Sequence, residues 1–143
     1  MRFWDSSAIV PLCVDAPEAL ATRALLRRDQ AMAVWWATRT ECVSALARQV
    51  REGSIDLRGE GQARAILATL GQVWSEVQPS EALRTLAERL LATHPLRAAD
   101  ALQLAAAVQW RGGPSIAAEF VSFDGRLRGA AYAEGFAVLP AVT

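Results

Sequence analysis

The sequence predicts an α/β fold, in which a mainly parallel sheet of about five strands lies between two layers of helices. Short apolar runs alternate with longer amphipathic segments along the chain, as is typical of strands connected by helices. The 143 residues suit one domain, and 52% of them are hydrophobic, which excludes disorder. Because the chain contains no repeat, linker or low-complexity tract, we expect a single domain over residues 1–143.

Five short apolar runs have the length and composition of buried strands. The expected strands are residues 3–4, 31–36, 73–77, 120–123 and 136–139, of which 73–77 has the weakest pattern. Helical periodicity between them predicts the first two helices, one starting near Ser7 and one with Pro17 in its first turn, where proline is favoured.

The remaining helices are expected from their start and stop signals. Thr38 or Thr40 would cap a helix that Gly53 ends, and another would follow over residues 57–70. Ser80 would cap a helix that Pro95 ends. The last two helices are expected over residues 96–110 and in a short segment that ends at Gly135.

Charge and composition exclude several classes of protein. The formal net charge is zero, so attraction of the whole molecule to nucleic acid is weak. All basic residues are arginine, whereas phosphotransfer enzymes of the haloacid-dehalogenase and receiver types rely on a lysine near the phosphate. His94 is the only histidine and is expected at the surface, which argues against a histidine-rich zinc site and a Ser-His-Asp triad.

The cysteines and the apolar runs bear on the cellular compartment. Cys13 and Cys42 form no ligand motif and lie in apolar helical segments, so we expect buried free thiols in a reducing cytoplasm. The apolar run 8–14 is short, contains Pro11 and follows Asp5, so we reject a signal peptide. No apolar run has transmembrane length, and we expect no membrane association.

Four acidic residues are predicted to converge at one edge of the sheet. Asp5 and Asp124 follow strands, and Glu41 and Asp100 lie near helix starts. Clustered carboxylates repel one another unless a divalent metal ion lies between them. The sequence therefore predicts a metal-dependent hydrolase.

Each acid also has a simpler interpretation. Asp5 is a good helix cap, and Glu41 suits the first turn of a helix because of the helix dipole. Asp100 has the spacing for an ion pair with Arg97, and Asp124-Gly125 suits a hairpin turn. Independent caps would scatter over both edges of a sheet, so their common placement favours a site.

The residues at these positions resemble the PIN domain, and specifically the VapC-type toxin ribonucleases. The matching segments are DSS (5–7), TE (40–41), RAADALQLA (97–105) and SFDGRL (122–127), which together span almost the whole chain. The resemblance implies a PIN-like three-layer α/β/α sandwich and cleavage of RNA phosphodiester bonds with Mg²⁺ or Mn²⁺. It also implies a protein antitoxin as partner and a homodimer.

Carried over by position, the resemblance makes Asp5, Glu41, Asp100 and Asp124 the catalytic acids. Asp5, Asp100 and Asp124 would bind the metal. Ser7 and Ser122 match positions where a small hydroxyl residue supports the site, with serine in place of the more frequent threonine at 122.

Arg39, Arg97 and Arg126 flank the acids in sequence and are candidates for RNA backbone contacts, although ordinary surface ion pairs would also explain them. Trp4, Trp35 and Trp36 adjoin strand ends, where we expect core packing rather than base stacking. A non-catalytic PIN-like module that binds RNA or protein remains the alternative function, although the intact acidic quartet argues against it.

Overall fold

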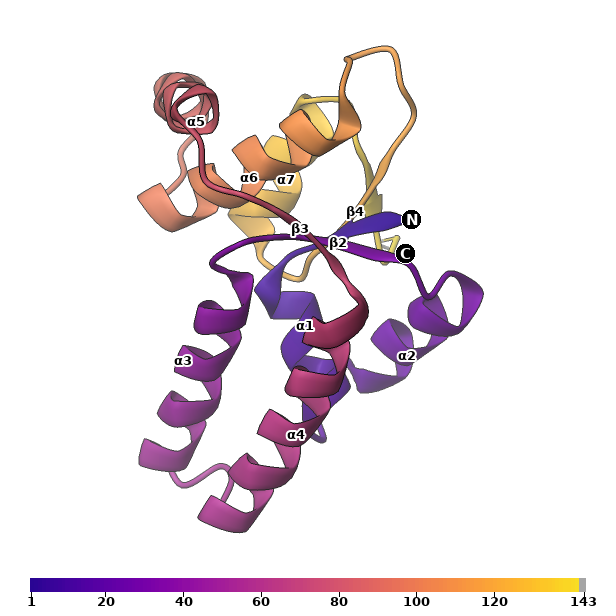
Figure 1. The fold of residues 1–143 in the computed structure, drawn as a ribbon, viewed down its shortest axis with the longest axis vertical. Coiled ribbons are helices and arrows are strands. Elements are labelled where there is room, and N and C mark those ends of the chain that lie inside the picture. The colour runs from indigo at the N-terminus through magenta and orange to yellow at the C-terminus, as the bar shows by residue number, and fades with distance from the viewer. Residues whose placement is uncertain (142–143) are drawn as a thin grey trace.

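The computed structural model describes residues 1–141 and confirms the expected three-layer α/β/α sandwich (Figure 1). All five strands pair in parallel, in the order β3-β2-β1-β4-β5. The strands are β1 (Arg2–Trp4), β2 (Met32–Trp35), β3 (Ser75–Val77), β4 (Glu119–Val121) and β5 (Ala137–Leu139). Because β1 lies at the centre between β2 and β4, the segments that follow these three strands meet at one edge of the sheet.

Helices cover both faces of the sheet (Figure 1). One face carries α1 (Ser6–Cys13), α2 (Ala19–Arg28), α3 (Thr38–Arg51) and α4 (Leu57–Val73). The other carries α5 (Glu81–Thr93), α6 (Ala98–Arg111) and α7 (Gly125–Ala133). No helix within residues 1–141 is long and apolar enough to cross a bilayer.

Each face of the sheet has its own hydrophobic core, because side chains alternate between the two faces of a strand. On β1, Phe3 packs with residues of α5, α6 and α7, whereas Trp4 packs with residues of α1, α3 and α4. Phe120 and Val121 divide in the same way on β4. This double burial explains why the strands are continuous apolar runs.

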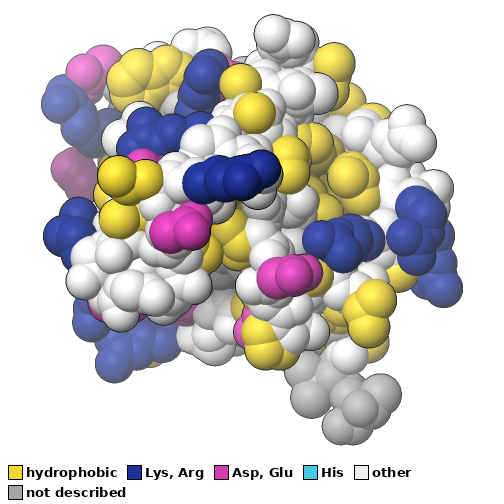
Figure 2. Space-filling model, turned by 90° about the horizontal axis from the view of Figure 1, so that it is seen from below, with side chains coloured by type: hydrophobic (Ala, Val, Ile, Leu, Met, Phe, Trp, Pro, Cys, Tyr) yellow, Lys and Arg dark blue, Asp and Glu magenta, His cyan; other side chains and the backbone are white. Residues whose placement is uncertain are grey.

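The molecular surface mixes charge and apolar side chains. Seen from the side of α3 and α4, basic and acidic groups are interspersed with hydrophobic ones and no single charge covers the face (Figure 2).

Cys13 and Cys42 are buried free thiols, as expected.

Several local expectations are wrong. Thr38 does not cap α3: Ala37 occupies the N-cap without a side-chain bond, and Thr38 is fully buried. Proline 17 precedes α2, which starts at Ala19. The helix α4 continues to Val73, into the segment expected to be a strand, because its backbone hydrogen bonds run on to Trp74.

The expected surface position of His94 is also wrong. Its side chain is only 9% exposed, and its Nε2 lies 2.7 Å from Glu134 Oε2. The partner is 40 residues away in sequence, so no local pattern indicates the contact.

Candidate active site at the carboxyl edge of the sheet

The four predicted acids lie at the carboxyl edge of the sheet, each near a helix start. Asp5 follows β1 and is the N-cap of α1, and Asp124 follows β4 and is the N-cap of α7. Glu41 and Asp100 lie in the first turns of α3 and α6. The cap interpretation of Asp5 is therefore correct as far as it goes, whereas the hairpin interpretation of Asp124 is wrong, because Asp124 also caps a helix.

Two serine hydroxyls hold one oxygen of Asp5. Ser7 Oγ and Ser122 Oγ donate to Asp5 Oδ2 at 2.6 Å and 3.0 Å. Each hydroxyl in turn accepts a backbone N–H, from Phe123 at 2.9 Å and from Asp124 at 3.1 Å. The turn after β4 thus fixes the orientation of the Asp5 carboxylate, whose Oδ1 has a long contact of 3.4 Å from Ser6 Oγ.

Glu41 is held by two side chains that the sequence interpretation did not single out. Ser6 Oγ donates to Glu41 Oε1 at 3.1 Å, and Gln103 Nε2 donates to the same oxygen at 2.8 Å. Ser6 thereby links the neighbourhoods of Asp5 and Glu41. A signal existed for Gln103, which is a polar residue three positions after Asp100 in a segment otherwise rich in Ala and Leu.

The surroundings of three of these carboxylates shift their pKa values. Burial, above all, raises the pKa of Asp5, against the opposing effect of its hydrogen bonds from Ser7 and Ser122. Burial also raises the pKa of Glu41, and the charges of Asp5 and Asp100 add to the increase. The pKa of Asp100 is raised by burial and then by the charges of Asp124 and Asp5.

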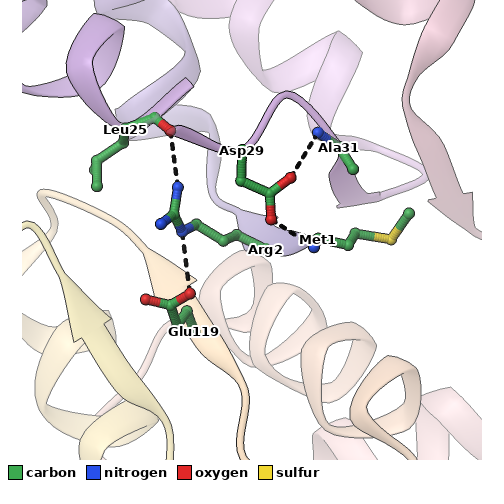
Figure 3. A network of polar contacts seen from close by, with 6 residues as sticks. All are labelled: Met1, Arg2, Leu25, Asp29, Ala31 and Glu119. Carbon is green, nitrogen blue, oxygen red and sulfur yellow. Dashed lines mark hydrogen bonds and ion pairs between the residues drawn. The ribbon is translucent and has the colours of Figure 1, made fainter. Parts of the chain in front are cut away.

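Cations compensate acids at the opposite edge of the sheet. There, Arg2 Nε lies 3.1 Å from Glu119 Oε1 and its Nη1 donates to Leu25 O at 2.7 Å, while the Met1 ammonium lies 2.6 Å from Asp29 Oδ2 (Figure 3). Within residues 1–141, none of the four acids at the carboxyl edge has a cationic group within 4.0 Å. The simpler interpretation of Asp100, an ion pair with Arg97, is therefore not borne out among the described residues.

Two clefts open at the site. One, of about 560 Å³, is lined by Asp100 and Asp124 together with Arg97 and Arg126, so these arginines lie beside the acids. The other, of about 730 Å³, runs from Glu41 between α1 and α3.

Arg39 lines neither cleft. Its Nη1 lies 3.8 Å from the point where a Cβ on Gly71 would stand, so its side chain extends toward α4. Its expected role in RNA binding is thus not supported by its position.

The three tryptophans near strand ends differ in burial. Trp4 and Trp35 are buried, as expected for core packing. Trp36 is 52% exposed, so the expectation of core packing is wrong for this residue.

The donor chemistry of the site suits a hard divalent cation, which prefers carboxylate and other oxygen ligands. Within residues 1–141, however, no three acidic, histidine or cysteine side chains are already gathered closely enough to hold a metal ion. The residues fit such an ion by chemistry and charge, although the described side chains do not form a ready-made metal-binding group.

Three solved structures are similar to this protein over most of its length. VapC20 from Mycobacterium tuberculosis, a toxin that cleaves the sarcin-ricin loop, matches with a TM-score of 0.68 and 19% identity, over 91% of this chain and 95% of that chain. PAE2754 from Pyrobaculum aerophilum matches with a TM-score of 0.67 and 18% identity, over 96% and 81% of the two chains.

A chain of a toxin–antitoxin complex from Klebsiella pneumoniae matches with a TM-score of 0.63 and 17% identity, over 90% and 92% of the two chains. The protein described here has the fold of the VapC toxins. No protein-family model and no curated protein matches the sequence. At these identities the likeness establishes the VapC fold, and function rests on the site.

The raised pKa values predict how metal-free stability depends on pH. A carboxyl group whose pKa is higher in the folded than in the unfolded state favours folding when protonated. Raising the pH through the raised pKa values of Asp5, Glu41 and Asp100 should therefore lower stability, and acidifying from neutral pH toward their ordinary values should restore it.

Thermal melts with chelator, from neutral pH down toward the ordinary pKa range of carboxyl groups, measure this effect. The Asp5→Asn variant lacks one of the three titrating groups and shares the others, so its melting temperature should rise less on acidification. Parallel pH profiles for the two proteins would contradict a raised pKa at Asp5.

Proposed function

We propose that this protein is a ribonuclease that requires Mg²⁺ or Mn²⁺ and hydrolyses RNA phosphodiester bonds, as the toxin of a type II toxin–antitoxin pair. One observation carries the proposal: four carboxylates share the carboxyl edge of the sheet without a cationic partner among the described residues. Such an arrangement costs free energy unless a cation compensates it. The shared fold with VapC20 makes RNA the favoured substrate.

Asp5, Asp100 and Asp124 would hold the metal ion. Asp5 is prepared for this role, because Ser7 and Ser122 occupy its Oδ2 and leave Oδ1 available. A bound divalent ion would lower the pKa of a water molecule and polarise the scissile phosphate.

Glu41 would complete the site by orienting the attacking water. Its Oε1 already accepts hydrogen bonds from Ser6 and Gln103, so Oε2 is the oxygen that can accept a proton or hydrogen bond from the nucleophile. Arg97 and Arg126 line the same cleft as Asp100 and Asp124, and they would bind phosphate oxygens of the RNA backbone.

The alternative is a non-catalytic module with the same fold that binds RNA or protein. The lack of a preassembled metal-binding group within residues 1–141 is the observation that favours it. The two functions differ in one measurable property, which is the turnover of RNA.

An RNA cleavage assay with purified protein tests the choice. Structured and single-stranded RNAs are incubated with Mg²⁺ or Mn²⁺, and in parallel with excess chelator. We expect cleavage only with metal. Binding of RNA without cleavage under both conditions would favour the non-catalytic module.

The toxin role predicts an effect in cells. Expression of the protein alone should arrest bacterial growth by cleaving RNA, and co-expression of a cognate antitoxin should restore growth. An Asp100→Asn variant expressed at the same level is the matched control and should be harmless. Normal growth and intact RNA with active wild-type protein would remove the toxin role while leaving the nuclease.

Assembly belongs to the same proposal. We expect a homodimer that binds a protein antitoxin. Light scattering of the protein alone, and of the protein with its partner, would measure the oligomeric state.

A further inference from the structure

Gln103 occupies a position where an amide is costly. It lies on α6 three residues after Asp100, is 1% exposed, and is flanked on the buried face by Ala101, Leu104 and Ala107. A buried amide destabilises the protein unless its hydrogen bonds are satisfied. Its Oε1 is one of the buried polar atoms that have no partner among the described residues.

The donor half of the same amide is fully used. Gln103 Nε2 donates to Glu41 Oε1 at 2.8 Å and to Thr38 Oγ1 at 2.9 Å. The opposite orientation of the amide would place its carbonyl oxygen against the Glu41 carboxylate, so the contact itself favours the orientation with nitrogen toward Glu41. This geometry explains why Thr38 is buried beside the site rather than acting as a helix cap.

The amide therefore joins α6, which carries Asp100, to the first turn of α3, which carries Glu41. The negative charges of Asp5 and Asp100 act on Glu41 and favour displacement of its carboxylate away from them. Hydrogen bonds from Gln103 and Ser6 to Glu41 Oε1 oppose that displacement. They also fix the position of Oε2, because it belongs to the same carboxylate.

We propose that Gln103 is a positioning residue that fixes the Glu41 carboxylate for RNA cleavage, with Thr38 holding the amide in place. The inference rests on the proposed ribonuclease function for its effect on rate, but the contact itself is independent of that function. An apolar residue at 103 would avoid the cost of the orphaned carbonyl, so burial alone does not explain the amide, and its contact with Glu41 does.

The test compares Gln103→Met, which keeps the length of the side chain and removes both polar atoms, with Gln109→Met. Gln109 is exposed on the same helix and contacts none of the four acids through a hydrogen bond in the described residues. Gln103→Met should lower kcat by about 10- to 100-fold, the usual effect of losing a group that orients a catalytic ligand. Its KM for RNA should stay within about twofold, because Gln103 touches Glu41 and not the substrate clefts.

The melting temperature separates positioning from a structural role. Gln103→Met should melt near the wild-type temperature, because loss of the orphaned Oε1 offsets loss of the hydrogen bonds to Glu41 and Thr38. Gln109→Met should match the wild type in both rate and stability. An unchanged kcat in folded protein would overturn the inference, as would a loss of activity that merely follows a loss of fold in both Gln103→Met and Gln103→Leu. Gln103→Leu provides the same comparison if the methionine variant does not fold.

A nuclear magnetic resonance measurement tests the contact without activity. The side-chain N–H signals of Gln103 should exchange slowly with water in the wild-type protein, and should shift and exchange faster in Glu41→Ala. Unchanged signals would overturn the inference. An inactive wild-type protein with this contact intact would instead overturn the proposed reaction and support the positioning of Glu41 by Gln103.

Discussion

Replacing Asp5 or Asp100 with asparagine is expected to lower metal-dependent RNA cleavage by more than about 100-fold, which exceeds the usual effect of losing a group that only orients a metal ligand. Asparagine keeps the size of the side chain and one carbonyl oxygen, so the hydrogen bonds from Ser7 and Ser122 to position 5 can persist. The negative charge that attracts a divalent ion is lost. Single-turnover cleavage rates with Mg²⁺ and Mn²⁺ measure the effect.

Glu88→Gln is the matched control, because Glu88 is an exposed acid on α5 and makes no ion pair among the described residues. It should cleave at the wild-type rate. Folded Asp5→Asn or Asp100→Asn protein that retains wild-type activity would remove that residue from the metal site. Glu41→Gln should also impair cleavage, through the loss of the oxygen that accepts a proton.

The sheet edge was predictable because it depends on local patterns. Buried parallel strands are continuous apolar runs, and the polar residue that ends each run marks the carboxyl edge. Asp5 and Asp124 follow adjacent strands β1 and β4, so the prediction of a parallel sheet was sufficient to bring them together. The two serines that hold Asp5 were found through the family resemblance and not through their contacts.

The contacts within the site were not predictable to the same degree. Gln103 and Glu41 are 62 residues apart, and the apolar segment around Gln103 indicates burial without identifying Glu41 as its partner. The sequence gives no separate signal for a role of Ser6, because its neighbours Asp5 and Ser7 already explain the segment as a helix cap. In both cases the tertiary arrangement of α1, α3 and α6 decides the partner.

Element ends and single exposures also depended on tertiary packing. Trp74 is 7% exposed and anchors the end of α4 in the core, which extends the helix beyond the predicted boundary. Trp36 follows Trp35 directly, yet one side chain is exposed and the other buried because they point to different sides of the chain as β2 ends.

Divalent metal should stabilise the folded protein, and this second large effect does not require RNA. Burial raises the pKa values of Asp5, Glu41 and Asp100, and the charges of neighbouring acids raise those of Glu41 and Asp100 further, so the ionised site without metal opposes folding. An ion that binds only the native state at one hundred times its Kd adds about 2.7 kcal/mol. For a chain of this size, that corresponds to a rise in melting temperature of roughly 5–10 °C.

Asp5→Asn separates this effect from the role of Asp5 as a helix cap. Asparagine caps a helix about as well as aspartate, so a purely structural Asp5 predicts equal melting temperatures for the two proteins, with or without metal. A metal site predicts that the variant melts at or above the wild-type temperature in chelator and gains less from added Mg²⁺ or Mn²⁺. Ca²⁺ and Na⁺ at matched ionic strength control for general screening. A wild-type melting temperature that stays constant from chelator to saturating Mn²⁺ would count against metal binding at the carboxyl edge, because a ligand that binds only the native state must stabilise it.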